Sequence, residues 1–322
     1  MRWLKILVAI VILYLVLAHV GMSALVRALL EIDLFSILLL LLISAILITI
    51  SALKWQQFLS VAGETVPLLT LIKLYTLGYF FNVFFPSYVG GDVARSYYLG
   101  KSLNSNTAAY SSTFFERWSG LVAMTALGLF FVMRGTNVAA GFEVAITLVA
   151  LGVFFGTWVI FSKHALNIFL KLIKQIPLPQ ITAKLEKLIL KVSGHVSEVK
   201  ANPRLMFNTL LLSFLYHLIA VLNTYVAGRA VGWETQNISE LFVVVPLALL
   251  IGMIPVTPGG IGVQEGAFVF LLERIGATKA QGLGLALVLR AKTILIAILG
   301  GLILMLVQKQ HKKTAKELLS NA

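Results

Sequence analysis

The sequence predicts an all-α polytopic integral membrane protein with six transmembrane helices and two re-entrant broken-helix hairpins, arranged as an inverted repeat. Of its 322 residues, 59% are hydrophobic and 12% are charged, and the mean hydropathy is +0.94, far above that of an ordinary soluble domain. Apolar windows near 20 residues, long enough to cross about 30 Å of hydrocarbon, recur along the chain. Two further apolar regions are interrupted by proline and paired glycine.

The six full spans are predicted from the apolar windows. They cover residues 3–20, 34–53, 118–133, 143–162, 205–228 and 283–307. The first has an apolar run near the upper length of a secretory signal peptide. Because many spans follow it, a retained first span is predicted.

The two interrupted regions, 66–100 and 240–274, are each interpreted as two half-helices that enter the membrane and leave on the same side. The distribution of Lys and Arg residues along the chain supports this interpretation. Residues 163–204 hold eight Lys and Arg residues against two glutamates, and the tail, 308–322, holds four lysines against one glutamate. With six full crossings, both basic segments and both termini lie in the cytoplasm, in agreement with the positive-inside rule.

The chain is therefore predicted to form a single membrane domain, residues 1–322, in the cell membrane. Repeat 1 covers about 34–162 and repeat 2 about 205–307, with the basic segment 163–204 between them. Part of this segment has an apolar helical face made by Ile181, Leu185, Leu188, Val192, Val196 and Val199. That pattern is typical of a helix lying flat at the headgroups.

An internal repeat links the two hairpins. Pro86-x-x-x-Gly90-Gly91 recurs 169 residues later as Pro255-x-x-x-Gly259-Gly260. Three predicted full crossings separate the copies, so the second is inverted relative to the first. Paired broken helices in inverted repeats are typical of transporters with a substrate site near the midplane. The alternative is that both breaks are structural kinks, with glycine for close helix packing.

The helix ends at these breaks are expected to offer free N–H groups to an anion, at Gly91-Asp92 and at Thr257-Pro258 or Gly260. Charged residues cluster near the breaks, where each needs a partner or a purpose because charge is costly at bilayer depth. They are Asp92, Arg95, Glu116, Arg117, Glu265, Arg290 and Lys292. Ligand contact and internal ion pairing are both open for each. His217, within a span, suits either packing or proton transfer.

Several classes of function are disfavoured. The net charge of +13 comes without a basic helix or an RNA-binding pattern, so the expected partners are anionic lipids and not nucleic acid. The chain has no cysteine, which excludes thiolate metal sites and disulfides. No catalytic or dinucleotide motif fits its context, so neither enzyme activity nor a cofactor or metal is expected.

Combined motifs resemble the flippase-like transmembrane region of the lysylphosphatidylglycerol synthase family. The first is N-x-x-x-P-x-x-x-G-G-D-x-x-R, made by Asn82, Pro86, Gly90, Gly91, Asp92 and Arg95. Glu116-Arg117 follows. The next is P-x-T-P-G-G-x-G-x-x-E from Pro255, with Thr257, Pro258, Gly259, Gly260, Gly262 and Glu265, and the last is Arg290.

This resemblance implies a lipid-translocation unit that moves polar-headed lipids between leaflets, with these residues at the substrate. No aminoacyltransferase domain is expected with this transmembrane region, so the resemblance does not select an aminoacylated lipid, and an anionic phospholipid and a polyprenyl-phosphate-linked lipid both fit. Two alternatives stay open: a secondary transporter of a small soluble anion, and a non-transporting accessory subunit of a lipid-modifying enzyme. A homo-oligomer is also compatible with the sequence.

Overall fold

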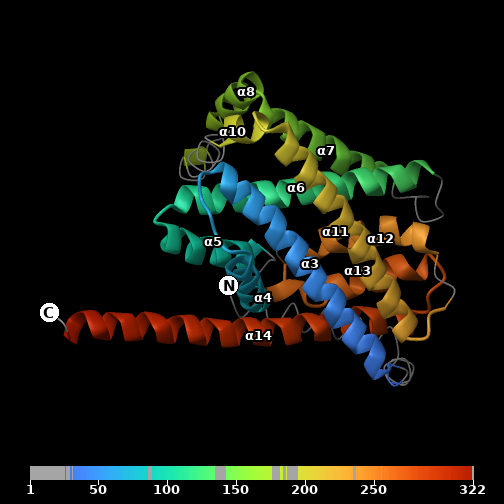
Figure 1. The fold of residues 1–322 in the computed structure, drawn as a ribbon. Coiled ribbons are helices and arrows are strands. Elements are labelled where there is room, and N and C mark those ends of the chain that lie inside the picture. The colour runs from blue at the N-terminus through green and yellow to red at the C-terminus, as the bar shows by residue number, and fades with distance from the viewer. Residues whose placement is uncertain are drawn as a thin grey trace.

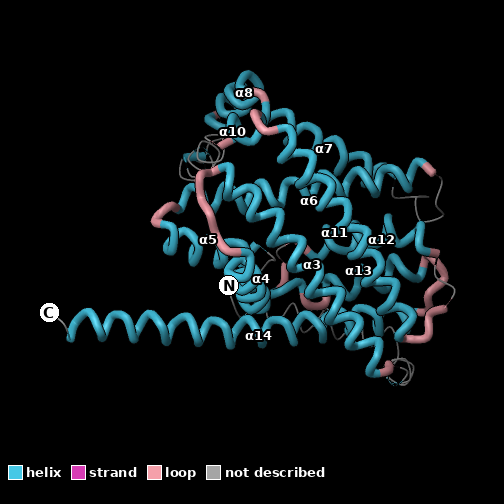
Figure 2. The backbone as a smooth tube through the Cα atoms, viewed as in Figure 1, coloured by secondary structure: helices cyan, strands magenta, loops and turns pink. Residues whose placement is uncertain are grey.

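The fold was obtained as a computed structural model. It describes residues 32–85, 89–134, 143–175, 195–234, 237–254 and 256–320, a few isolated positions (26, 30, 182, 183 and 186), and side chains as far as Leu306. Every regular element in this part of the chain is a helix (Figures 1 and 2). The predicted first span, 3–20, lies outside the described residues.

Four helices are long and apolar enough to cross a membrane. They are α3 (Leu34–Val61), α6 (Asn106–Met133), α11 (Pro203–Ala230) and α14 (Lys279–Ser320), the last through its part up to Leu306. The first three have 28 residues each, or about 42 Å at 1.5 Å per residue. These helices contain the predicted spans 34–53, 118–133, 205–228 and 283–307.

Helix α6 begins well before the span predicted from hydropathy. Its first residue is Asn106, and the Ser105 hydroxyl accepts a hydrogen bond from the Ala108 amide at 3.4 Å, which caps the helix. The first turns are polar, so the hydropathy window missed them. The sequence placed Glu116 and Arg117 just before the predicted span 118–133. In the structure both residues lie inside α6.

The predicted span 143–162 corresponds to α7 (Glu143–Phe161), which turns by 107° into α8 (Lys163–Lys174). The Ser162 hydroxyl between them accepts a hydrogen bond from the Ala165 amide at 3.2 Å and caps α8. If the bent pair is one span, it is the fifth candidate by length and composition; a pair bent this way also fits a re-entrant loop.

The basic segment continues to α10 (Val196–Lys200), while most of its predicted apolar face lies outside the described residues. Val196 and Val199, the last two members of that face, are buried in a cluster with Phe58 and Phe115. These two valines therefore pack against α3 and α6 and do not face the headgroups.

Both interrupted regions are pairs of short helices around a break. The first pair is α4 (Leu68–Phe84) and α5 (Val89–Leu103). The second is α12 (Ile238–Gly252) and α13 (Val263–Glu273), with a 3₁₀ turn, η2 (Pro258–Gly260), in the break. Within each pair the two helices pack on one another. Pro86 and Pro255 lie outside the described residues.

The two halves of the chain interlock. Helix α4 packs on α14, α12 packs on α6, and α3 lies against α11 (Figure 1). Gly300 makes the first contact possible, because a side chain there would meet the carbonyl of Thr76. Among the described residues, a large apolar core joins α12, α13, α14 and the end of α11.

The packing inside the two halves matches. In the first half α3 packs on α4 and α5 packs on α6; in the second, α11 packs on α12 and α13 packs on α14. The same pattern in both halves is what duplication of one unit would produce. The re-entrant course of the hairpins and the inversion of the second unit across a membrane stay predictions.

Candidate functional site

The two breaks meet at the carboxyl end of α4. The Gly259 amide donates to the carbonyl oxygen of Phe85 at 3.0 Å, and a Cβ atom on Gly259 would lie 3.3 Å from the carbonyl oxygen of Asn82. The side chain of Asn82 accepts a hydrogen bond from the Gly91 amide at 2.7 Å. One helix end therefore contacts both predicted glycine pairs, which the sequence places 169 residues apart.

The glycine amides that were expected to be free are already used within the protein. Gly91 donates to Asn82 and Gly259 to Phe85, as above, while Gly260 donates to the Thr257 carbonyl at 3.2 Å and Gly262 to the Glu265 carboxylate at 2.7 Å. Anion binding by these four amides would require their present bonds to break. The side-chain cations are therefore the better candidates for a first contact.

The glycines serve different physical needs in the two breaks. Gly259, Gly260 and Gly262 have φ values of +56°, +67° and +82°, where L side chains are disfavoured. Gly91 is helical, but a side chain there would meet the carbonyl oxygen of Gly78. The first pair thus allows close helix packing and the second allows a sharp turn.

A network of five charged side chains joins α3, α5 and α6. Asp92 bridges Arg95, at 2.9 Å, and Arg117, at 2.7 Å. Glu116 bonds Arg95 at 2.8 Å and Lys54 at 3.2 Å. With three positive and two negative members, the network has an excess of one positive charge.

Arg95 is enclosed within this network. Its side chain is 1% exposed, and its guanidinium lies 4.4 Å from the ring centre of Trp55 and 4.1 Å from that of Tyr75. Such stacking stabilises a cation away from water. The Tyr75 hydroxyl donates to Glu116 at 3.0 Å. Direct headgroup contact by Arg95 would need this enclosure to open, so a positioning role suits the residue better.

Arg117 is the accessible cation of the network. Its side chain is 44% exposed, and two of its nitrogens bond the carboxylate of Asp92. The helix that carries Asp92 also has an apolar surface: Val89, Val93 and Tyr97 form an exposed stripe along α5, at the helical spacing of four residues. An exposed arginine whose partner lies on a helix with an exposed apolar stripe suits a ligand with both an anionic group and a hydrocarbon part.

The second break carries its own ion pair. Glu265 accepts the Gly262 amide on one carboxylate oxygen and pairs with Arg290 at 2.6 Å on the other. Arg290 also donates to the carbonyl oxygen of Gly259 at 2.7 Å and to the side chain of Gln264 at 3.3 Å. This arginine therefore holds the turn and the start of α13 together.

The two ion pairs have the same spacing. Asp92 and Arg117 lie 25 residues apart, and so do Glu265 and Arg290. In each half the acid lies on the second half-helix and the arginine on the following span. Gly91 directly precedes Asp92, whereas four residues separate Gly260 from Glu265, so the acids do not align under the glycine offset. Their shared spacing could have been found from the sequence.

Three other polar side chains near the site were not singled out in the sequence. Lys54 is a member of the charge network, and Trp55 and Tyr75 contact it. Lys54 was missed because the predicted span ended at residue 53, one position before it. The other two are aromatic residues in apolar helices and carry no signal of their own.

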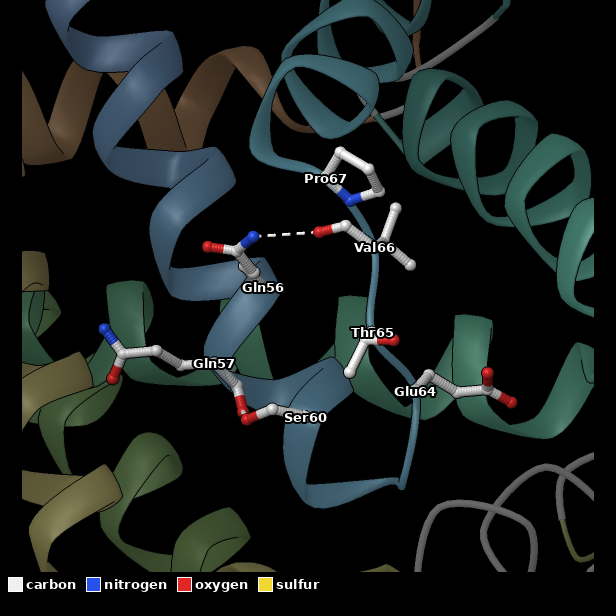
Figure 3. Close-up of a pocket in the computed structure, with 7 residues that line it drawn as sticks. All are labelled: Gln56, Gln57, Ser60, Glu64, Thr65, Val66 and Pro67. Atoms are coloured by element: carbon white, nitrogen blue, oxygen red, sulfur yellow. Dashed lines mark hydrogen bonds between the residues drawn. The ribbon is translucent and has the colours of Figure 1, made fainter.

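A pocket of about 490 Å³ lies where α3 leads into α4 (Figure 3). It is lined by Gln56, Gln57, Ser60, Glu64, Thr65, Val66 and Pro67. Gln56 donates to the Val66 carbonyl at 2.8 Å, which holds the connection against α3. None of the predicted site residues lines this pocket, so it is separate from the two breaks.

Comparisons with known proteins cover most of the chain. A sequence model of the lysylphosphatidylglycerol synthase TM region matches residues 2–301. A UPF0104 membrane protein of Pyrococcus horikoshii is 24% identical, over 94% of this chain and 96% of that protein. Another, of Methanothermobacter thermautotrophicus, is 23% identical over 80% of this chain and 81% of its own length. The matched residues 2–301 contain both breaks and both ion pairs.

Proposed function

This chain belongs to the family of the lysylphosphatidylglycerol synthase transmembrane region, and we propose that it moves a lipid with an anionic or polar headgroup between membrane leaflets. The lipid is an anionic phospholipid or a polyprenyl-phosphate-linked lipid. The protein acts in the cell membrane with both termini in the cytoplasm. It works as a transporter and not as an enzyme.

The observation that carries this proposal is the environment of Arg117. An arginine binds phosphate oxygens through parallel N–H bonds, and this one is exposed while its partner Asp92 is mostly covered. Asp92 lies on α5, and on that helix Val89, Val93 and Tyr97 form an exposed apolar stripe. A headgroup can bind Arg117 while its acyl chains lie along the stripe.

The same observation favours a lipid over a small soluble anion. A transporter of a soluble anion needs a cation enclosed in a polar cavity, because hydrocarbon gives no solvation to an ion that leaves its site. Arg117 is instead exposed, and its partner Asp92 lies on a helix with an exposed apolar stripe. This arrangement is suited to a ligand whose tail can stay in the bilayer during movement of the head.

In this proposal the two halves supply two contacts to one headgroup. Arg117 acts from the first half and Arg290 from the second, each held by a carboxylate 25 residues earlier. Asn82 keeps the breaks together through Gly91 and Gly259. Arg95 and Glu116 fix the position of Asp92 and thereby of Arg117.

Purified protein in liposomes tests the proposal. Labelled phosphatidylglycerol, phosphatidic acid, phosphatidylethanolamine and polyprenyl phosphate are compared for exposure to a membrane-impermeant quencher, and phosphate uptake is measured in the same vesicles. We expect faster exchange of at least one anionic lipid than in protein-free liposomes, without phosphate uptake. Phosphate uptake without lipid exchange would establish the soluble-anion transporter. If neither lipid exchange nor phosphate uptake is observed, the result favours the accessory subunit.

Arg229 provides the matched control. It lies in an exposed ion pair with Glu234 at 3.8 Å, and its side chain is 50% exposed, close to the exposure of Arg117. Arg229→Gln should leave lipid exchange unchanged, and Arg117→Gln should reduce it. An equal loss in both variants would point to surface charge in general and not to a site at Arg117.

A further inference from the structure

A row of polar contacts leads from the charge network along the interface between α6 and α11. The Ser213 hydroxyl donates to the Ser119 hydroxyl at 3.1 Å, and Nε2 of His217 lies 2.9 Å from the carbonyl oxygen of Gly120. The side chain of His217 is buried, and the proposed lipid site gives it no role. Histidine is the side chain whose charge changes most readily near neutral pH.

Lys54 connects His217 to the network. Because Gly120 has no side chain, Nζ of Lys54 and Nε2 of His217 both approach the same point: a Cβ atom there would lie 3.7 Å from the first and 3.9 Å from the second. Lys54 is itself bonded to Glu116, whose neighbour Arg117 carries the exposed guanidinium. The imidazole and the proposed anion site are thus at two ends of one connected set of charges.

The hydrogen bonds of the imidazole define where a proton can add. A carbonyl oxygen can only accept, so Nε2 of His217 carries the hydrogen that Gly120 accepts. Nδ1 makes no hydrogen bond with any described residue. A proton from solvent adds to the lone pair of Nδ1 and gives the imidazolium, and no other bond forms or breaks.

The charges around His217 oppose this step while the site is empty. Lys54 from α3 approaches the imidazole and is bonded to Glu116 of α6, and the network they belong to has one excess positive charge. The other helices packed on α11 contribute Lys292 of α14, the buried Glu240 of α12, and the exposed Glu198 and Lys200 of α10. A second excess positive charge in a poorly solvated region is unfavourable.

We propose that His217 is a proton-binding site coupled to anion binding at Arg117, so that an anionic headgroup is carried together with a proton. A bound anion with one negative charge brings the net charge of the network to zero. Protonation of His217 then adds one positive charge, so the net charge is again that of the empty site. Coupling of this kind is reciprocal: the anion favours the proton and the proton favours the anion. The proposal rests on the proposed function for its ligand, and it adds the source of energy, a proton gradient.

Proton uptake on ligand binding tests the coupling directly. The full chain in detergent, weakly buffered and with a pH indicator, is titrated with dioctanoyl phosphatidylglycerol and, separately, with inorganic phosphate. We expect uptake of up to one proton for each lipid bound, and none with phosphate, since it lacks the hydrocarbon part. In His217→Gln the ratio of protons to bound lipid should fall to near zero. His164→Gln, which changes an exposed histidine on α8, should keep the wild-type ratio.

A second measurement works without any ligand. Arg117→Gln removes one positive charge, as a bound anion would, so His217 should take up its proton at a higher pH than in the wild type. The imidazole resonance is followed by NMR and assigned from its absence in His217→Gln. A higher protonation pH with no lipid binding would preserve the coupling and overturn the lipid proposal. Lipid binding without proton uptake, together with an unchanged protonation pH, would overturn the coupling and leave the lipid proposal standing.

Discussion

The backbone amide of Gly259 donates a hydrogen bond to the carbonyl oxygen of Phe85 at 3.0 Å. This single bond joins the break of the first hairpin to that of the second. Asn82, one turn before Phe85, holds Gly91 through its side chain and lies against Gly259 through its backbone. The two broken helices therefore form one structural centre, and the two carboxylate–arginine pairs lie on the helices that lead away from it.

Replacing Arg117 tests the proposed headgroup contact. Hydrogen bonds to a charged group contribute about 1.5–3 kcal/mol, so Arg117→Gln should slow lipid exchange roughly ten- to hundredfold. Arg117→Lys should recover part of the rate, because it keeps the charge and loses the paired N–H geometry. Exchange is measured in liposomes per folded molecule. Full activity in the glutamine variant would remove Arg117 from the site.

Arg290→Gln should reduce exchange as well, with a larger loss of stability than Arg117→Gln. The reason is that Arg290 also bonds the Gly259 carbonyl and Gln264, and so supports the turn. Thermal unfolding in detergent and lipid exchange are measured on the same preparation. Lost stability with normal exchange per folded molecule would make Arg290 a structural residue only.

Glu116→Gln should be among the most destabilising single changes in the protein. It leaves Lys54 and Arg95 buried without their shared carboxylate, and breaking a buried pair costs about 3–5 kcal/mol. Glu273→Gln is the control, since its pair with Lys279 at 3.9 Å is on the surface and should contribute less than about 1 kcal/mol. Unfolding free energies in denaturant compare the two. Similar values would show that the network contributes little to stability.

Replacement of the break glycines should impair transport, and the structure refines how. From the sequence, leucine at Gly91 and Gly260 should impair activity similarly, with alanine milder. At Gly91, however, even alanine would meet the Gly78 carbonyl oxygen, so Gly91→Ala should already be severe. Gly128→Ala, in an open position on α6, should be neutral or stabilising by up to about 1 kcal/mol. Lipid exchange and unfolding temperature are measured for each; a mild Gly91→Ala would mean that α4 and α5 can separate.

The topology is testable because the chain has no native cysteine. A single cysteine at Ala139 should react with an impermeant maleimide only from outside the cell, and one at Lys187 only from the cytoplasm. The basic segment around Lys187 is expected inside because positive charge is retained there. Labelling of either position from the opposite side would exclude six crossings with two re-entrant hairpins.

The all-helical membrane fold and the two breaks could be predicted from the sequence because hydropathy and the repeated glycine motif are local signals. The partners of the charged residues could not. Arg95 and Arg117 look equivalent in the sequence, and only the packing of α3, α4, α5 and α6 together encloses the first beside Trp55 and Tyr75 and leaves the second exposed.

Hydropathy also misplaced the edges of the spans. The polar start of α6 lowered the window average, although those residues are helical and packed against α5. Lys54 was excluded from a span for the same reason, because a lysine inside a helix of the membrane domain is favourable only when a partner such as Glu116 is near. Apolar windows therefore underestimate the length of helices that carry an internal ion pair.

The interlocking of the two halves has a consequence for the order of synthesis. Helix α4 packs on α14 and α6 packs on α12, so the first half leaves the ribosome without the surfaces that cover it. With roughly 200 residues between α4 and α14, and translation at about 5–20 residues per second, α4 waits some 10–40 s for its partner. During this interval the face of α4 that will pack on Gly300 of α14 must be covered by lipid or by an insertion chaperone. When each half is expressed by itself as a separate chain, it should accordingly be degraded. When both halves are expressed in the same cell, both should accumulate.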